Sequence, residues 1–295
     1  MPVSWRRSTT VLALCGGLLT SPILGANLTA AGAAPTTGSS DFAQFADTPR
    51  LGSVDNFRDV AGTGAGYINQ DGHHVARGAF YRSNAVTPDD IDWATLSLLG
   101  LRNVYDLRSA SEITAKADRL PLGANYLNIP IMSGDLGQTF RVSTAEQARE
   151  LLREANRSFV TGAFERAGFA TLLTQLAQQP GPAVFHCTAG KDRTGWATYL
   201  LLSLAGVDRE TIIADYLLTN EYSAASISAT IAQMEKTRGA EFAAAYAPLM
   251  GVEREFLEAG IDELALSYGS VDNYLRAGLG LSETTIEQLR TKLVR

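Results

Sequence analysis

The residue types most suited to chemistry lie together in one run of ten, His186-Cys187-Thr188-Ala189-Gly190-Lys191-Asp192-Arg193-Thr194-Gly195. A short apolar stretch, Pro182 to His186, leads into it and predicts a buried strand. A strongly apolar stretch, Thr194 to Ala205, follows and predicts a helix. The run is therefore a loop at a helix N-terminus, where backbone N–H groups lack intrahelical partners and the helix dipole adds positive charge. Such amides can bind a phosphate or a sulfate.

Cys187 has the surroundings of a nucleophile in this loop. A helix N-terminus and a nearby cation lower a cysteine pKa from its ordinary value of roughly 8.5, which favours the thiolate. Arg193, six positions later, can grip two phosphate oxygens with its planar guanidinium. Thr194 can donate a hydrogen bond to the sulfur, and Gly190 leaves space where the backbone approaches the anion. The pattern predicts phosphoryl chemistry at Cys187.

Two more side chains of the run have expected roles. Lys191 adds a second cation, which would attract substrates with several negative charges; the alternative is a solvated surface lysine. His186 ends the strand, where side-chain alternation turns it away from the loop. We therefore expect His186 to support the loop rather than to transfer protons.

The elements that position this loop alternate between strands and helices. Asp71-Gly72 suits a β-hairpin turn within Gly66 to Arg82, Thr87-Pro88 opens a helix that stops at Gly100, and Ser111 with Glu112 begins another. Strands are expected at 101–107, 124–131 and 182–186, and helices at 144–159, 162–178 and 194–205. This order favours an α/β fold with a central, mostly parallel sheet flanked by helices.

The segment from Thr211 to Leu266 reads as almost entirely helical. A helical insertion that follows a site in this way is a candidate lid. A second helical layer explains the same pattern, and the sequence leaves both alternatives open.

Composition narrows the class of protein. The chain has 295 residues, of which 45% are hydrophobic, and its 31 acidic residues outnumber its 25 basic ones. A net charge of −6 argues against nucleic acid as a partner, because a phosphate backbone is bound mainly through positive charge. We expect one catalytic domain over residues 46–295.

The N-terminal residues resemble a secretory signal. Arg6-Arg7, an apolar run from Val11 to Leu19 and a small-residue segment with a cleavage site near Ala33 follow each other in the usual order. We expect a signal peptide over residues 1–34, a linker over 35–45 and a secreted protein. General secretion fits better than twin-arginine export, because the residues after the arginines match that signal weakly.

No stable membrane anchor is expected. The apolar run is shorter than the roughly 20 residues that span a bilayer. Leu14 is bulky where a lipoprotein signal needs a small residue before Cys15. Cleavage also removes Cys15, so Cys187 is the only thiol of the exported form.

The run resembles the signature loop of the protein tyrosine phosphatase superfamily, His-Cys-(five residues)-Arg-(Ser/Thr). Its Gly-Lys-Asp-Arg-Thr-Gly ending is similar to the bacterial branch of atypical tyrosine and phosphoinositide phosphatases, which includes secreted enzymes of mycobacteria and Listeria. Other segments agree with this branch: Asn56-Phe57-Arg58-Asp59, Phe80-Tyr81-Arg82-Ser83, Asp106-Leu107-Arg108-Ser109 with Glu112, Asp215-Tyr216, Tyr268-Gly269-Ser270 and Gly280-Leu281-Ser282.

The resemblance implies a two-step phosphoryl transfer that uses neither a metal nor an organic cofactor. Cys187 would attack phosphorus while Arg193 and the backbone amides of Thr188, Ala189, Gly190, Lys191 and Asp192 hold the oxygens. Water would then hydrolyse the phosphocysteine. The implied partners are phosphorylated proteins, or lipid or inositol phosphates.

The general acid is not fixed by the resemblance, because the Trp-Pro-Asp loop of many members is absent. Asp192 borders the pocket in any loop geometry, Asp106 ends a neighbouring strand, and Asp135 lies in an upstream Ser-Gly-Asp loop. For Asp106, a structural role in holding Arg108 or backbone amides is as well supported as a catalytic one.

Several alternatives stay open at this point. Arg58 and Asp59 could brace the loop from beneath or touch substrate, with bracing favoured. His73-His74 lacks further ligands nearby in sequence and predicts no metal site. An inositol phosphate phosphatase and a secreted module that binds phosphorylated ligands without turnover are the competing functions.

Overall fold

The signature loop follows the central strand of a mostly parallel sheet. The computed structural model describes residues 47–132 and 142–294, and these belong to the unit formed by residues 39–295. The sheet has the order β1-β2-β5-β3-β4. Its strands are β1 (Arg58–Asp59), β2 (Phe80–Ser83), β5 (Ala183–His186), β3 (Asn103–Asp106) and β4 (Asn125–Asn128). Only β1 is antiparallel to its neighbour.

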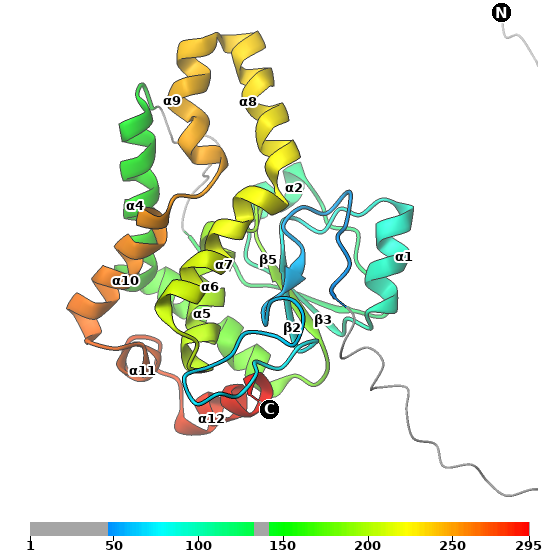
Figure 1. Cartoon of the computed structure of the whole chain (residues 1–295), viewed down its shortest axis with the longest axis vertical. Coiled ribbons are helices and arrows are strands. Elements are labelled where there is room, and N and C mark those ends of the chain that lie inside the picture. The colour runs from blue at the N-terminus through cyan, green and yellow to red at the C-terminus, as the bar shows by residue number, and fades with distance from the viewer. Residues whose placement is uncertain (1–46, 133–141, 295) are drawn as a thin grey trace, which may run out of the picture. The chain divides into compact units, whose positions relative to one another are not determined.

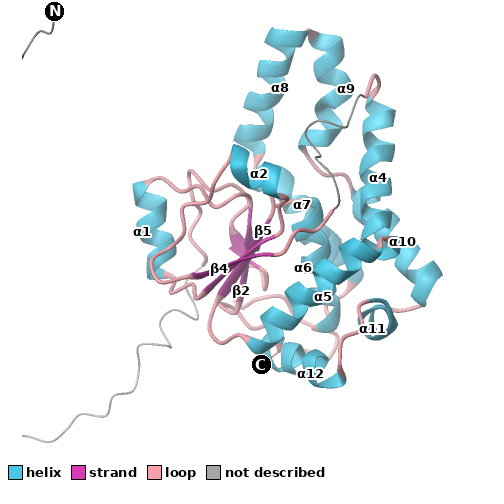
Figure 2. Ribbon diagram, turned by 180° about the vertical axis from the view of Figure 1, so that it is seen from behind, coloured by secondary structure: helices cyan, strands magenta, loops and turns pink. Residues whose placement is uncertain are grey.

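Both faces of the sheet are covered, as the sequence predicts (Figures 1 and 2). Successive strand residues point to opposite faces, so alternate side chains enter two clusters. The larger cluster contains Phe80, Tyr105 and Phe185. The smaller cluster contains Tyr81, Val104 and Val184. The larger cluster packs under α5 (Ala163–Gln178), α6 (Asp192–Leu204) and α12 (Glu283–Leu293), and the smaller one under α1 (Asp90–Leu98). The expected fold class is confirmed.

The helical segment after the loop has two parts. Its helices are α7 (Arg209–Tyr222), α8 (Ala224–Arg238), α9 (Ala240–Met250) and α10 (Arg254–Tyr268). α10 packs against α4 (Ala145–Thr161) and so forms a second helical layer. α8 and α9 form a hairpin whose α9 arm contacts α4, while α8 buries no side chain. The role of the hairpin as a lid stays a prediction.

After α10 the chain passes through α11 (Val271–Asn273) and a π-helical turn, η2 (Tyr274–Gly278), before α12. Among the described helices, none is both long and apolar enough to cross a bilayer. The predicted signal peptide, the linker and Asp135 lie outside the described residues.

Three helix starts differ from the sequence prediction, and capping side chains decide the first two of them. Asp89 accepts a hydrogen bond from the amide of Asp92, so α1 starts after Asp89 and not at Pro88. Ser109, rather than Ser111, caps α2 (Ala110–Ala115). α6 begins at Asp192, two residues earlier than predicted. Asp192 and Arg193 therefore stand on the first helical turn.

The predicted hairpin is also different. The turn at Gly72 forms, with its N–H donating to Asn69, but the two arms share only a single bridge between Ile68 and His74. β2 pairs with β1 instead. The physical reason is that β2 is buried between two strands, so its pairing is decided by the sheet rather than by the nearest turn.

Candidate active site

The carbonyl groups of the signature loop, residues 187–193, are held on its outer side. The carbonyl of Gly190 accepts hydrogen bonds from the side chains of Asn56 at 2.7 Å and Arg82 at 2.9 Å. The carbonyl of Thr188 accepts one from the backbone of Ala85 at 3.2 Å. These bonds fix the direction of the peptide groups, because a carbonyl and the following N–H point opposite ways across a planar peptide.

The N–H groups of the loop are consequently free. Within the described part of the chain, none of the N–H groups of residues 188–193 donates to a protein acceptor. They precede or begin α6, whose N-cap residue Lys191 makes no side-chain cap. Unpaired N–H groups at a helix start attract anions. The arrangement fits the phosphate site predicted from the sequence.

Two glycines of the run are required by close contacts. Gly190 has φ +67°, and a Cβ there would lie 2.4 Å from the carbonyl oxygen of Ser83. A Cβ on Gly195 would lie 2.8 Å from the ring of Tyr216. Larger residues would push the loop off β2 or off α7, so both glycines keep the loop against its supports.

Cys187 directly follows β5 and interacts electrostatically with two guanidinium groups, those of Arg193 and Arg82. Its side chain is buried, with the residue 3% exposed. The negative charge of Cys187 helps raise the pKa of Arg193 above its ordinary value, against the lowering effect of burial. Burial lowers the pKa of Arg82 to about 10, while Asp215 and Cys187 oppose that effect.

Glu112 of α2 orients Arg193. Its two carboxylate oxygens accept hydrogen bonds from both terminal nitrogens of Arg193, at 2.9 and 2.6 Å, in a bidentate pair. One of the same oxygens also accepts the hydroxyl of Thr188. Burial opposes ionisation of Glu112, but these bonds from Arg193 lower its pKa to about 2. The carboxylate therefore stays ionised at neutral pH and holds Arg193 at the loop.

A buried ion-pair network supports the loop from beneath. Asp215 of α7 accepts hydrogen bonds from Arg58 at 3.1 Å, Arg82 at 2.9 Å and the hydroxyl of Tyr67 at 3.1 Å. Burial alone would raise the pKa of Asp215, but the two arginines lower it below the ordinary value. Arg58 also donates to the side chain of Asn56. Because Asn56 and Arg82 hold the Gly190 carbonyl, the network fixes the loop.

Arg58 thus braces the loop, whereas Asp59 does not reach it. The carboxylate of Asp59 accepts the backbone N–H groups of Ala61 at 2.9 Å and Gly78 at 2.7 Å. Burial raises the pKa of Asp59 to about 6. The predicted bracing role of Asp59 is therefore replaced by a local one, which is to fasten the chain between β1 and β2.

Asp106 has a geometry unsuited to a general acid. It is fully buried and pairs with Arg108 at 2.7 and 2.8 Å, while Tyr126 donates to it at 2.8 Å. Burial would raise the pKa of Asp106, but Arg108 and the nearby His186 lower it. An ionised carboxylate with its oxygens occupied has no proton to donate, so the structural reading of Asp106 is the one that the geometry supports.

His186 lies in the same buried cluster. Its Nε2 is 3.1 Å from Asp118 and 3.9 Å from Asp106. The three residues present potential metal-ligand atoms within 4.8 Å of one another. The guanidinium of Arg108 already lies against both carboxylates, at 2.8 Å from Asp118, and neutralises part of their charge. The side chain of His186 thus lies in this buried cluster, and its expected role in supporting the loop stays a prediction.

Asp192 differs from Asp106 in being accessible. Its side chain is 17% exposed and lies on the first turn of α6, next to Arg193. The hydroxyl of Tyr216 donates to it at 3.5 Å, and the ammonium of Lys191 lies 3.5 Å away. Of the candidate acids in the described residues, Asp192 is the one placed at the loop. Asp135 lies outside the described residues.

Lys191 is neither a solvated lysine nor a free cation. Its ammonium donates to the carbonyls of Leu249 at 2.7 Å and Gly251 at 2.9 Å, where α9 ends. The residue is 7% exposed. The expectation that Lys191 attracts highly charged substrates is corrected here, because its protons are already bound by the helical hairpin.

Thr194 is fully buried, and its hydroxyl makes no hydrogen bond with any described residue. The predicted bond from Thr194 to the sulfur of Cys187 is not formed in this structure. The hydroxyl nevertheless remains without a competing partner in the described chain.

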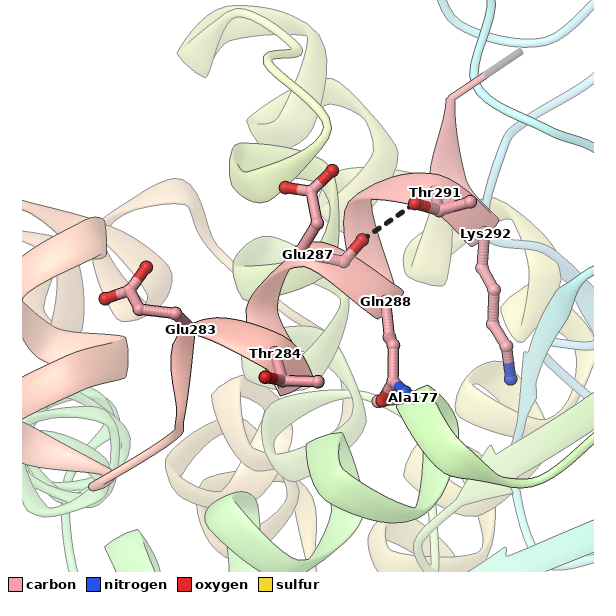
Figure 3. A pocket seen from close by; sticks show the side chains of 7 residues that line it. All are labelled: Ala177, Glu283, Thr284, Glu287, Gln288, Thr291 and Lys292. Atoms are coloured by element: carbon pink, nitrogen blue, oxygen red, sulfur yellow. Dashed lines mark hydrogen bonds between the residues drawn. The ribbon is translucent and has the colours of Figure 1, made fainter.

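Two pockets lie in different parts of the described chain. A pocket of about 180 Å³ adjoins the signature loop and includes Thr188, Ala189 and Lys191 in its lining. A larger one of about 570 Å³ lies over α12 and the end of α5 (Figure 3). The only cation in its lining, Lys292, donates to the carbonyls of Leu176 and Gln179. Of these two pockets, the smaller one is therefore the one that adjoins the predicted chemistry.

Four residues that hold the loop have no role that the local sequence predicts: Asn56, Arg82, Glu112 and Asp215. Each occurs in a segment that resembles the family, but the signal for Glu112 was only that of a helix start. Its carboxylate does accept the N–H of Ser109 as a cap, at 2.9 Å. Long-range contacts with Arg193 give it the second function.

Comparisons with known proteins identify the family of the chain. A family model described as "Tyrosine phosphatase family" matches residues 49–295. A Cupriavidus necator protein named as a candidate tyrosine-protein phosphatase is 34% identical over 81% of this chain and 85% of its own length. The triple specificity protein phosphatase PtpB of Mycobacterium tuberculosis is 29% identical over 81% of this chain and 96% of its own. The crystal structure of Pseudomonas aeruginosa TpbA covers 70% of this chain and 91% of that chain, with 16% identity and a TM-score of 0.29.

Replacing Glu112 with glutamine is expected to lower stability in a pH-dependent way. The folded-state pKa of about 2 lies below the ordinary 4.5, so the carboxylate stabilises the fold above pH 4.5, and this contribution is lost as the pH falls toward 2. We expect Glu112→Gln to lower the free energy of unfolding by about 2 kcal/mol at pH 6 and by clearly less at pH 3. Urea unfolding at both pH values measures the two differences.

Glu154→Gln is the matched control, because Glu154 forms an exposed ion pair on α4. It should remain within about 0.5 kcal/mol of the unmodified protein at both pH values. An equal loss at pH 6 and pH 3 for Glu112→Gln would contradict the assignment of this carboxylate to Arg193.

Proposed function

The chain belongs to the tyrosine phosphatase family, and we propose that it hydrolyses phosphomonoesters, above all phosphotyrosine in proteins, through a cysteinyl-phosphate intermediate. One observation carries the proposal. Residues 188–193 have unpaired N–H groups, and the same loop contains Cys187 and the guanidinium of Arg193. A nucleophile and an anion site thus occupy the same loop.

In the first step, the sulfur of Cys187 attacks phosphorus and the bond from phosphorus to the leaving oxygen breaks. The loop N–H groups and Arg193 bind the three equatorial oxygens as charge redistributes among them. Asp192 donates a proton to the leaving oxygen, so a neutral alcohol or phenol departs. The product on the protein is the phosphocysteine.

In the second step, water attacks the phosphocysteine. Asp192, now ionised, accepts a proton from that water, and the sulfur of Cys187 leaves as thiolate. Inorganic phosphate is released and both side chains return to their starting states. The position of Asp192 beside Arg193, with part of its side chain accessible, supports this role.

Phosphoserine, phosphothreonine and phosphoinositides are the further substrates considered for this site. The name of the Mycobacterium tuberculosis relative, a triple specificity phosphatase, indicates a broad substrate range for that protein. A panel of phosphopeptides and phosphoinositide vesicles, compared by kcat/KM, ranks these classes. Proteins phosphorylated on tyrosine are the class we propose here.

We also propose that the protein is secreted, on the strength of its N-terminal sequence. Expression of the full chain in a bacterial host, followed by mass spectrometry of the medium and the cells, tests it. The expected product in the medium begins close to Pro35, because the small-residue segment before it suits a signal peptidase. Recovery of only the full-length chain from the cell interior would contradict secretion.

Cys187→Ser is expected to abolish turnover and to keep substrate binding. A serine hydroxyl is a far weaker nucleophile here, while the free N–H groups and Arg193 remain in place. We expect kcat to fall by about 10⁴-fold or more, with the Kd for a phosphotyrosine peptide changed by less than about tenfold. Stopped assays and fluorescence anisotropy measure the two quantities. Turnover near that of the unmodified protein would remove Cys187 from the mechanism.

Asp192→Asn is expected to slow hydrolysis most for substrates whose leaving groups depart poorly without a proton. A phosphotyrosine peptide should lose about 10²-fold in kcat, because its phenolate needs the proton. p-Nitrophenyl phosphate should lose much less, since its leaving group departs without one. Asp90→Asn, an exposed change on α1, is the matched control. Equal losses on both substrates would argue against proton donation by Asp192.

A further inference from the structure

The pocket beside the signature loop continues into a lining that the phosphoryl transfer does not use. It extends from Thr188 and Ala189 to the segment before β1, the end of β2 and the base of the α8–α9 hairpin. Its volume of about 180 Å³ lies below the roughly 300–1,000 Å³ of small-molecule sites. A space of that size suits one side chain of a larger substrate whose phosphate is bound at the loop.

Polar atoms in this lining lack partners. The side-chain carbonyl of Asn84 and the hydroxyl of Ser223 are buried, with each residue 8% exposed, and neither makes a hydrogen bond in the described structure. Buried polar groups are nearly always paired, so unpaired ones beside a pocket indicate a ligand or water that completes them. Asn84 offers an acceptor, and Ser223 can accept as well as donate.

Among the described residues of the lining, one charged group, Asp55, is without a partner. Asp55 lies in the lining, and its carboxylate forms no hydrogen bond or ion pair with any described residue. Lys191 is the only cation in the lining, and its ammonium is bound by the carbonyls of Leu249 and Gly251. A second phosphate here would meet the unpaired carboxylate of Asp55. An ammonium or guanidinium would meet the same carboxylate in a lining that also contains the unpaired oxygens of Asn84 and Ser223.

We infer that this pocket binds a lysine or arginine side chain that flanks the phosphorylated residue of a protein substrate. The inference rests on the proposed phosphatase function and narrows its substrate class. Asp55 supplies the charge, while Asn84 and Ser223 supply acceptors for the remaining protons. The same lining disfavours headgroups with several phosphates, because no free cation is there to bind them.

The test compares three phosphotyrosine peptides that differ only in the residues on either side of the phosphotyrosine: lysine, acetyl-lysine or glutamate. Acetylation keeps the aliphatic chain of lysine, removes its charge and adds an acetyl group. We expect kcat/KM to fall about tenfold from lysine to acetyl-lysine and further for glutamate, mainly through KM. Equal kcat/KM for the lysine and acetyl-lysine peptides would overturn the inference, and so would a phosphoinositide vesicle hydrolysed with a higher kcat/KM than the lysine peptide.

The variant Asp55→Asn tests whether the preference for the lysine peptide depends on this pocket. It should reduce the ratio of kcat/KM for the lysine peptide to kcat/KM for the acetyl-lysine peptide to nearly one. Asp71→Asn should leave that ratio unchanged. Asp71 lies in the turn before Gly72, outside the lining, and asparagine suits that turn equally well. A ratio that survives in Asp55→Asn would place the preference elsewhere and overturn the inference.

The two proposals can fail separately. If the unmodified protein does not hydrolyse p-nitrophenyl phosphate, the proposed function fails. The pocket can still be tested by the Kd of Cys187→Ser for the lysine and acetyl-lysine peptides, which should differ about tenfold. Equal Kd values would overturn the inference, whatever the result with p-nitrophenyl phosphate.

Discussion

The site depends on the hydrogen bonds that turn the Gly190 carbonyl outward. Asn56 and Arg82 hold this oxygen, and the positive φ of Gly190 allows the loop to press on the backbone of Ser83. If that carbonyl turned inward, an electronegative oxygen would occupy the space meant for phosphate. The free N–H groups next to Cys187 are therefore a consequence of contacts made on the opposite side of the loop.

Charge balance makes this arrangement possible in a buried place. Arg58 and Arg82 are buried together, which is tolerable because Asp215 lies between them and Tyr67 completes its hydrogen bonds. Arg193 is matched in the same way by Glu112. Each guanidinium near the sulfur has a carboxylate behind it. Arg193 can therefore be held in one orientation before the substrate arrives, which reduces the reorganisation needed during the reaction.

The α8–α9 hairpin contacts the signature loop through its base rather than its tip. Lys191 joins the signature loop to the end of α9 by hydrogen bonds. Just beyond α9, the side-chain amide of Asn220 on α7 donates to the carbonyl of Val252 and accepts its N–H. The segment that the sequence marks as an insertion thereby forms part of the wall beside the loop. A lysine that a motif assigns to the substrate serves this connection instead, and Asp55 remains as the unpaired charge among the described residues of the adjoining pocket.

The sequence by itself determined the signature loop, the strand before it, the helix after it and the mostly parallel sheet, because these follow from local periodicity, glycines and one dense motif. Tertiary structure alone decided which residues hold the loop. Glu112 and Arg193 are 81 positions apart, and Arg58 and Asp215 are 157 apart. No local pattern reports such pairs, since they depend on how strands are ordered in the sheet. For the same reason the sequence left Asp106 and Lys191 open to catalytic readings, and only their buried partners assigned them to the scaffold.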